Sequence, residues 1–101
     1  MDEAFIRNRI TQLRLEKGVS EYQMSYDLGH SRGYVYNISS GKSLPPMREF
    51  LQICDYFDIT PQQFFDEKEE HPELIQKALN GFRELSEGDQ LFLLGLINRL
   101  K

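Results

Sequence analysis

The chain has 101 residues, of which 40% are hydrophobic and 28% charged, and its formal net charge is −4. This length suits one compact domain with an appendage, and no apolar run approaches the ~20 residues needed to span a bilayer. A single cysteine, Cys54, excludes an internal disulfide framework and a paired-cysteine metal site. The N-terminus, MDEAFIRNRI, lacks the apolar core of a signal peptide, so we expect a cytoplasmic protein.

The charge is unevenly distributed along the chain. Residues 1–45 carry a net charge of +1, and residues 46–101 carry −5. DNA-binding domains usually show a basic face, so this balance argues against avid non-specific binding to DNA. It leaves room for a local basic face on the first half, because exposed charges beyond about 8 Å are largely screened at physiological salt.

Five helices are predicted in the first 66 residues, and no segment alternates with period two for long enough to indicate a strand. We expect them over residues 3–17, 21–28, 32–40 and 46–57, with a short fifth helix from Pro61. Ser20 with Gln23, and Thr60 with Gln63, have the spacing of capping boxes, and Ser31 is the expected N-cap of the third helix. Apolar spacing predicts a core from Ile6, Ile10, Leu13, Met24, Leu28, Val35, Ile38, Met47, Phe50, Leu51, Cys54, Phe57, Phe64 and Phe65.

The last third of the chain predicts two more helices after a charged connector at residues 66–70. The sixth begins at Pro72 and ends near Leu85, and Ser86 with Asp89 caps the seventh. The seventh is apolar around most of its circumference, so it needs cover on more than one side. We expect one side to lie on the sixth helix and the other to meet a second copy of the chain. The predicted dimerisation residues are Leu91, Leu94 and Ile97.

Residues 19–45 form the most informative segment. Two short helices joined by a tight glycine-containing turn are the helix-turn-helix unit that reads DNA. If Val35 and Ile38 face the core, the third helix presents Gly33, Tyr36 and Asn37 outward, with Arg32 and Tyr34 on its flanks. Asparagine pairs with adenine and arginine with guanine in the major groove, so this face could read bases. An ordinary bundle helix with a polar outer face fits the periodicity equally well.

Tyrosine placement favours an interface. Four of the five tyrosines (Tyr22, Tyr26, Tyr34 and Tyr36) lie within residues 22–36, and so small a core cannot bury all of them. Exposed aromatic rings with a hydroxyl suit contact with DNA and with protein alike. Phosphate contacts are expected from Ser20 at the start of the second helix and from Lys42 and Ser43 after the third.

The order and spacing of apolar, glycine and polar positions between Ile6 and Asp66 resemble the Cro/C1-type (XRE) helix-turn-helix family. The positions that carry the resemblance are Ile6, Ile10, Leu13, Arg14, Lys17, Gly18, Val19, Ser20, Met24, Leu28, Gly29, Ser31, Arg32, Tyr34, Val35, Ile38, Gly41, Lys42, Pro45, Phe50, Leu51, Ile53, Cys54 and residues 57–64. The resemblance implies an all-α fold: a five-helix lambda-repressor-like DNA-binding bundle over residues 1–66 and a C-terminal two-helix dimerisation appendage over residues 67–101.

The same resemblance implies roles for individual residues. Base reading falls to Arg32, Gly33, Tyr36 and Asn37, and phosphate binding to Ser20, Tyr34, Lys42 and Ser43. Two positions depart from the family pattern. Glu21 stands where a phosphate-binding glutamine is common, and Ser39 stands where a glutamate often pairs with the arginine at position 14. Arg14 is therefore expected either to turn outward to phosphate or to pair with another acid.

The sequence thus favours a dimeric, sequence-specific regulator of transcription, most simply a repressor, whose partners are double-stranded DNA, a second copy of itself and a possible regulatory protein. The alternative is a protein-interaction module of the antitoxin or anti-repressor type that uses the same helices with little DNA binding. An enzyme is the least supported class, because no metal cluster, glycine-rich phosphate loop or nucleophile-base pair is evident. No cofactor or metal is expected.

Overall fold

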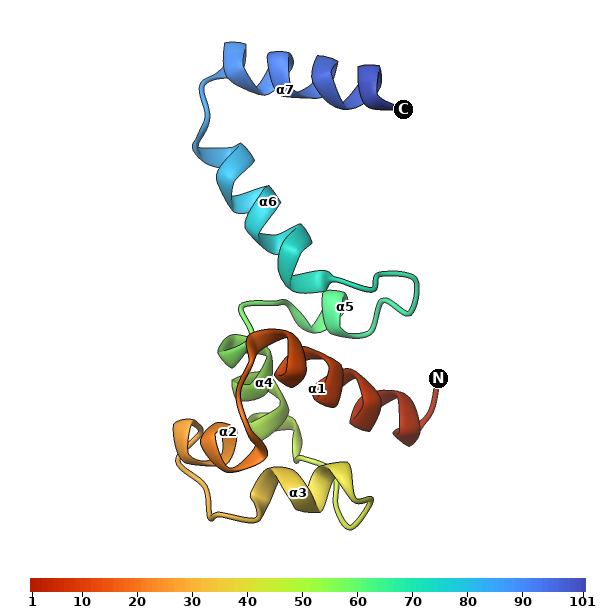
Figure 1. The fold of residues 1–101 in the computed structure, drawn as a ribbon, viewed down its shortest axis with the longest axis vertical. Helices are drawn as coiled ribbons and strands as arrows, with labels where there is room; N and C mark the ends of the chain where they lie inside the picture. The colour runs from red at the N-terminus through yellow and green to blue at the C-terminus, as the bar shows by residue number, and fades with distance from the viewer.

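The computed structural model describes residues 1–101 and is entirely helical, as the sequence predicted. Its elements are α1 (Glu3–Lys17), α2 (Glu21–Asp27), α3 (Tyr34–Ser39), α4 (Met47–Tyr56), α5 (Pro61–Phe64), α6 (Pro72–Glu84) and α7 (Glu87–Leu100). Helices α1 to α5 gather at one end, and α6 leads away from them to α7 at the other (Figure 1). The molecule measures 49 × 26 × 23 Å. None of the helices combines the length and apolarity needed to cross a membrane.

The core lies among α1 to α5. Its eleven buried apolar residues are Ile10, Leu13, Met24, Val35, Ile38, Phe50, Ile53, Cys54, Phe57, Ile59 and Phe64. The Phe64 ring meets the Phe50 ring edge-on at 4.9 Å between centroids, which closes the bundle over α5. Two residues predicted to face inward on α4 do not, since Met47 is 70% and Leu51 46% exposed.

Local signals fix most helix ends. Gly18 adopts the left-handed conformation (φ 77°) that ends α1, and Thr60 with Gln63 forms the predicted capping box of α5. Ser86 caps α7 by accepting from the Asp89 backbone N–H. The predicted capping box at Ser20 is only half formed: the Ser20 hydroxyl accepts from the Gln23 N–H, but the Gln23 side chain donates to Asp27 and does not accept from the Ser20 backbone N–H.

The arginines of α1 hold the bundle together through backbone carbonyls. The Arg9 side chain is buried and donates to the carbonyls of Phe64 and Asp66, which ties α1 to the end of α5. Arg7 donates to the carbonyls of Ile38 and Gly41 at the end of α3. These bonds satisfy carbonyls that a helix C-terminus leaves without an intrahelical partner.

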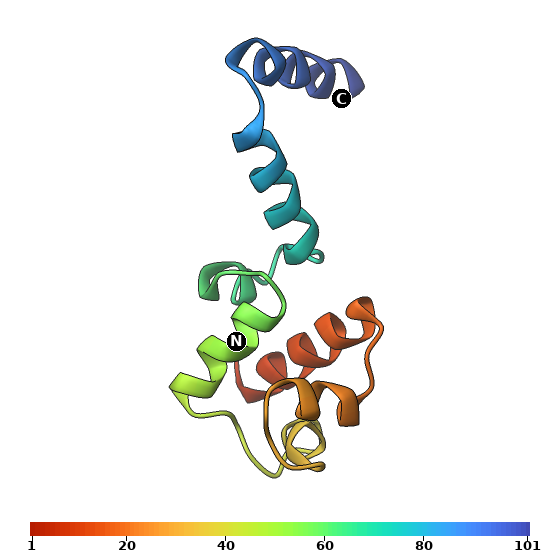
Figure 2. The same cartoon turned by 90° about the vertical axis from the view of Figure 1, so that its left-hand side faces the viewer.

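Helices α6 and α7 form an extended arm. Pro72, the first residue of α6, is buried against the bundle, but no residue of α7 is buried. The extended backbone of Leu85 and Ser86 turns the chain, so α7 runs across the end of α6 and does not lie along it (Figures 1 and 2). The prediction that one side of α7 lies on α6 is therefore wrong, and the apolar surface of α7 has even less cover than expected.

Candidate nucleic-acid interface

Helices α2 and α3 are locked together by one buried hydroxyl. The Ser25 Oγ atom donates to the Glu21 carbonyl at 2.8 Å and accepts from the Val35 backbone N–H at 3.1 Å. Ser25 is fully buried, so these bonds are shielded from water. Gly29, at φ 77°, makes the turn that brings α3 back against α2. The result is a two-helix unit with a fixed crossing.

The start of α3 differs from the prediction. The helix runs from Tyr34 to Ser39 with Gly33 as its N-cap, whereas residues 32–40 with Ser31 as N-cap were expected. Ser31 and the two residues after it belong to the connecting turn, where the Tyr34 N–H donates to the Ser31 carbonyl. Ser25 of α2, and not Ser31, supplies the side-chain acceptor at the start of α3.

The outward face of α3 carries the predicted polar residues. Val35 and Ile38 are buried as predicted, Tyr36 is 53% exposed, and Asn37 is half-buried. The Asn37 side-chain amide makes no hydrogen bond within the chain, although its backbone carbonyl accepts from Lys42 and Ser43. An amide at the surface with both donor and acceptor free can pair with a base edge.

Arg32 and Gly33 lie in the turn just ahead of α3. A side chain at position 33 would meet no atom of the chain within 4 Å, and the φ of Gly33 is negative. The fold itself therefore does not require glycine there. Space kept open at this point suits close approach of a second molecule to the start of α3.

Two cations border this face, and each lies over a tyrosine ring. The Arg32 guanidinium is 5.7 Å from the Tyr22 ring centroid, and the Lys42 ammonium is 5.7 Å from that of Tyr36. Cation–π attraction of this kind restrains a long side chain without removing its charge. These four exposed residues give the α2–α3 unit its positive, aromatic border.

The remaining basic residues of the first half are engaged elsewhere. Arg14 donates to the Val19 carbonyl at 2.8 Å and forms no ion pair, so the predicted alternative of an acidic partner is wrong, while the predicted phosphate contact stays a prediction. Arg7 and Arg9 also bind carbonyls, and Lys17 lies over the Tyr56 ring. Arg32 and Lys42 are thus the cations of residues 1–45 that lie beside α3 without a side-chain bond to a carbonyl.

The residues expected to contact phosphate differ in their access. Ser20 and Ser43 are exposed, and the Ser20 hydroxyl accepts from the Gln23 N–H at the start of α2. Tyr34 is only half-exposed; its ring stacks on His30 at 3.9 Å, and its hydroxyl oxygen is buried without a hydrogen-bond partner. Burial and the nearby Glu49 carboxylate raise the Tyr34 pKa. A phosphate contact from Tyr34 would need this hydroxyl to become exposed.

A polar network that the sequence did not indicate ties α2 to α4. The Asp27 carboxylate accepts from the Tyr56 hydroxyl and from the Gln23 amide, both at 2.6 Å. These bonds lower the Asp27 pKa, and burial together with Asp27 raises the Tyr56 pKa to about 12. Nearby, His30 lies 3.6 Å from the Glu49 carboxylate. These contacts hold α2 and the turn that follows it against α4.

Comparison with known proteins agrees with this geometry. A family model described as a helix-turn-helix domain matches residues 8–70, which is more than half of the chain. No curated protein and no solved structure matches. The matched range contains α2, α3 and every residue of their outward face.

Proposed function

The chain belongs to the helix-turn-helix domain family, and from this premise we propose that it binds double-stranded DNA in a sequence-specific way, with α3 in the major groove. Membership of the family itself indicates a DNA-binding regulator. The observation that supports sequence-specific reading is the surface of α3: an exposed Tyr36, a free Asn37 amide, and Arg32 and Gly33 at its start.

We assign base reading to Arg32, Gly33, Tyr36 and Asn37, and contact with the DNA backbone to Ser20, Lys42 and Ser43. Tyr34 would serve mainly to fix the turn through its stacking on His30. The small number of free cations implies weak non-specific binding, because that binding comes almost entirely from phosphate neutralisation. Specific contacts must then supply a large share of the affinity.

We further propose that the protein is a homodimeric repressor, the role that the Cro/C1 resemblance implies, with residues 1–66 as the DNA-binding bundle and residues 67–101 as the dimerisation segment. The support for dimerisation is the apolar surface of α7, where Leu91 is 62% and Leu94 and Ile97 are each 46% exposed. A second copy laid on this face would cover it and would place two α3 helices on one duplex.

The proposal is tested by selecting bound duplexes from a random pool at low salt with the full chain. We expect a palindromic site whose half-sites lie about 34–36 Å apart, one helical turn, or a multiple of that. Failure to enrich any sequence would overturn DNA reading and favour a protein-interaction role for the same surface. Enrichment of a single half-site without symmetry would overturn the dimer but leave the reading surface intact.

A further inference from the structure

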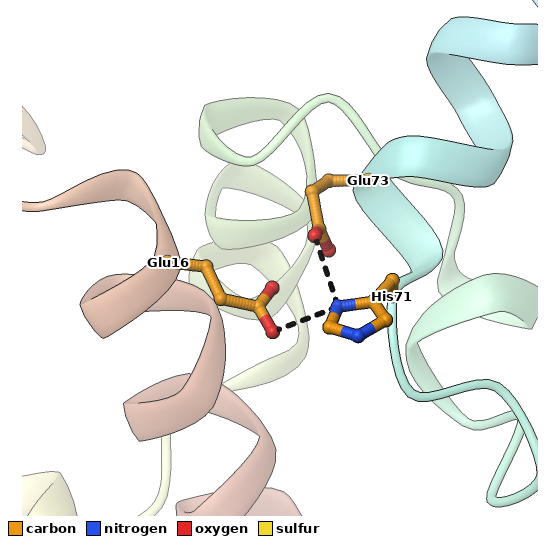
Figure 3. A group of neighbouring side chains, drawn as sticks. All are labelled: Glu16, His71 and Glu73. Atoms are coloured by element: carbon orange, nitrogen blue, oxygen red, sulfur yellow. Dashed lines mark ion pairs between the residues drawn. The ribbon is translucent and has the colours of Figure 1, made fainter.

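At the junction between the bundle and the arm, the structure brings together three ionisable side chains from two segments that lie far apart in the sequence. Glu16 comes from the end of α1, His71 immediately precedes α6, and Glu73 lies in the first turn of α6 (Figure 3). The His71 Nδ1 atom is 3.2 Å from Oε1 of Glu16 and 3.8 Å from Oε1 of Glu73. One ligand atom from each residue lies within 4.8 Å of the other two.

We propose that this cluster binds a divalent transition-metal ion of the Zn²⁺ type. Zinc binds histidine nitrogen and carboxylate oxygen at about 2.0–2.2 Å, which sets neighbouring ligand atoms of a tetrahedral site roughly 3.3 Å apart. The His71–Glu16 separation of 3.2 Å already matches, and Glu73 would have to move closer, since its oxygen is 3.8 Å from His71 and the three ligand atoms lie within 4.8 Å of one another. Three protein ligands leave a fourth position for water.

The donor set argues for the class of metal. Mg²⁺ and Ca²⁺ take oxygen ligands, whereas imidazole suits zinc and its neighbours in the first transition row. One imidazole with two carboxylates is therefore a transition-metal set. The earlier expectation of no metal rested on sequence spacing, and spacing could not reveal ligands contributed by two distant segments.

A second observation concerns Glu73 itself. One of its carboxylate oxygens, Oε2, is buried and has no hydrogen-bond partner, and the side chain is only 21% exposed. Its other oxygen, Oε1, is the atom that lies 3.8 Å from Nδ1 of His71. The ligand atoms of Glu16 and Glu73 lie within 4.8 Å of each other, so a cation between them would lower the repulsion of the two carboxylates. Coordination through both oxygens of Glu73 would also give Oε2 a partner.

The ligands are held from outside the cluster. The Gln12 amide donates to Oε1 of Glu16 at 3.2 Å and also to the Glu70 carbonyl, which joins α1 to the connector. The His71 backbone N–H donates to the Glu69 carboxylate at 2.8 Å. Such outer partners orient metal ligands and strengthen binding. The acidic residues 66–73, with Lys68 as their only cation, favour a bound cation.

An ion at this position would link α1 to the first turn of α6. It would thereby fix the direction in which the arm leaves the bundle. If α7 dimerises the protein, the ion would also restrain the distance between the two α3 helices; this consequence rests on the proposed function, whereas metal binding itself does not.

The test uses the full chain, Zn²⁺ as the probe and no DNA, so its outcome is independent of DNA binding. Histidine ring NMR signals are followed during a Zn²⁺ titration, and affinity is measured by competition with a chromogenic chelator. The only histidines are His30 and His71, so His30→Ala is the matched control. We expect Zn²⁺ to shift the His71 signals, to bind wild type and His30→Ala equally, and to bind His71→Ala at least ~10-fold more weakly.

Glu73→Gln gives a second variant that keeps the shape of the side chain if His71→Ala folds poorly, and it should weaken Zn²⁺ binding to a similar degree. Gln12→Ala, which removes an outer partner and no ligand, should weaken Zn²⁺ binding by ~10–100-fold or less. Added Mg²⁺ should not compete. The proposal is overturned if Zn²⁺ leaves the His71 signals unmoved, or if it binds the wild type no more tightly than it binds Glu73→Gln.

Discussion

The Ser39 hydroxyl donates a hydrogen bond to the Glu21 carboxylate, which joins the end of α3 to the start of α2. These are the two positions at which the chain departs from the Cro/C1 pattern. In the sequence the two departures are unrelated. Glu21 replaces a phosphate-binding glutamine, and Ser39 replaces a glutamate that would pair with Arg14. In the structure they are partners, and Arg14 is satisfied by the Val19 carbonyl instead. The acidic residue is therefore Glu21 on α2, and it contacts Ser39 of α3 and not Arg14.

The position of Glu21 predicts that Glu21→Gln strengthens DNA binding. The amide can still accept from Ser39, but it removes a negative charge at the helix end expected to face phosphate. One like-charge interaction at about 4 Å in water is worth ~1 kcal/mol, so we expect affinity to rise ~5-fold for specific and random duplexes alike. Gel shifts at two salt concentrations measure this. Ser39→Ala is the control, because it breaks the hydrogen bond without changing the charge and should give no gain.

Features fixed by neighbouring residues were predictable from the sequence. The caps of α5 and α7 depend on residues three positions apart, Thr60 with Gln63 and Ser86 with Asp89, and both formed as predicted. The inward position of Val35 and Ile38 follows from helical spacing alone. Local chemistry was therefore enough for the helices, their order and the outward face of α3.

Features that depend on a distant partner were not predictable. The start of α3 shifted because Ser25, ten positions upstream, supplies the acceptor for the Val35 N–H. The Tyr34 hydroxyl turned inward because its ring stacks on His30 beside Glu49 of α4. The separation of α7 from α6 follows from the extended backbone at Leu85 and Ser86: the sequence marked the break there, but not the angle at which α7 leaves it.

The buried Ser25 hydroxyl predicts a stability effect. Ser25→Ala should leave the Val35 N–H without a partner in the core and should lower the free energy of unfolding by about 1–3 kcal/mol. Urea denaturation followed by circular dichroism measures the change. Ser40→Ala, which alters an exposed hydroxyl, should change it by less than ~0.5 kcal/mol. Equal losses in the two variants would contradict the structural role given to Ser25.

Asn37 predicts a specificity effect. Its side-chain amide is free of internal bonds, so Asn37→Ala should leave stability unchanged while relaxing preference at one base position. The expected cost is ~1–3 kcal/mol on the selected site and close to zero on random duplex. Repeating the selection with the variant identifies the position. An equal loss of affinity on both kinds of duplex would show that Asn37 contacts the backbone.

Lys42 predicts the opposite pattern. Its ammonium lies over the Tyr36 ring at the end of α3, where it can neutralise one phosphate. Lys42→Ala should weaken binding to all sequences to a similar degree and should reduce the salt slope of log affinity by about 1. A salt titration on specific and random duplexes measures both quantities. Lys77→Ala, on α6 and away from α3, is the control and should leave the slope unchanged.

The apolar surface of α7 predicts how the protein assembles. Two leucines of this helix offer a matched pair of variants. Leu94 and Leu96 are similarly exposed, 46% and 42%, but they lie about 200° apart around the helix axis and therefore on nearly opposite faces. Leu94→Asp should place a charge in the proposed dimer face, whereas Leu96→Asp should place one opposite it. We expect sedimentation to show a monomer only for Leu94→Asp, with binding to a single half-site retained and the advantage of a paired site lost. Both variants should keep wild-type stability of the bundle, since no residue of α7 is buried in the single chain. A dimer that survives Leu94→Asp but not Leu96→Asp would move the interface to the other face of α7.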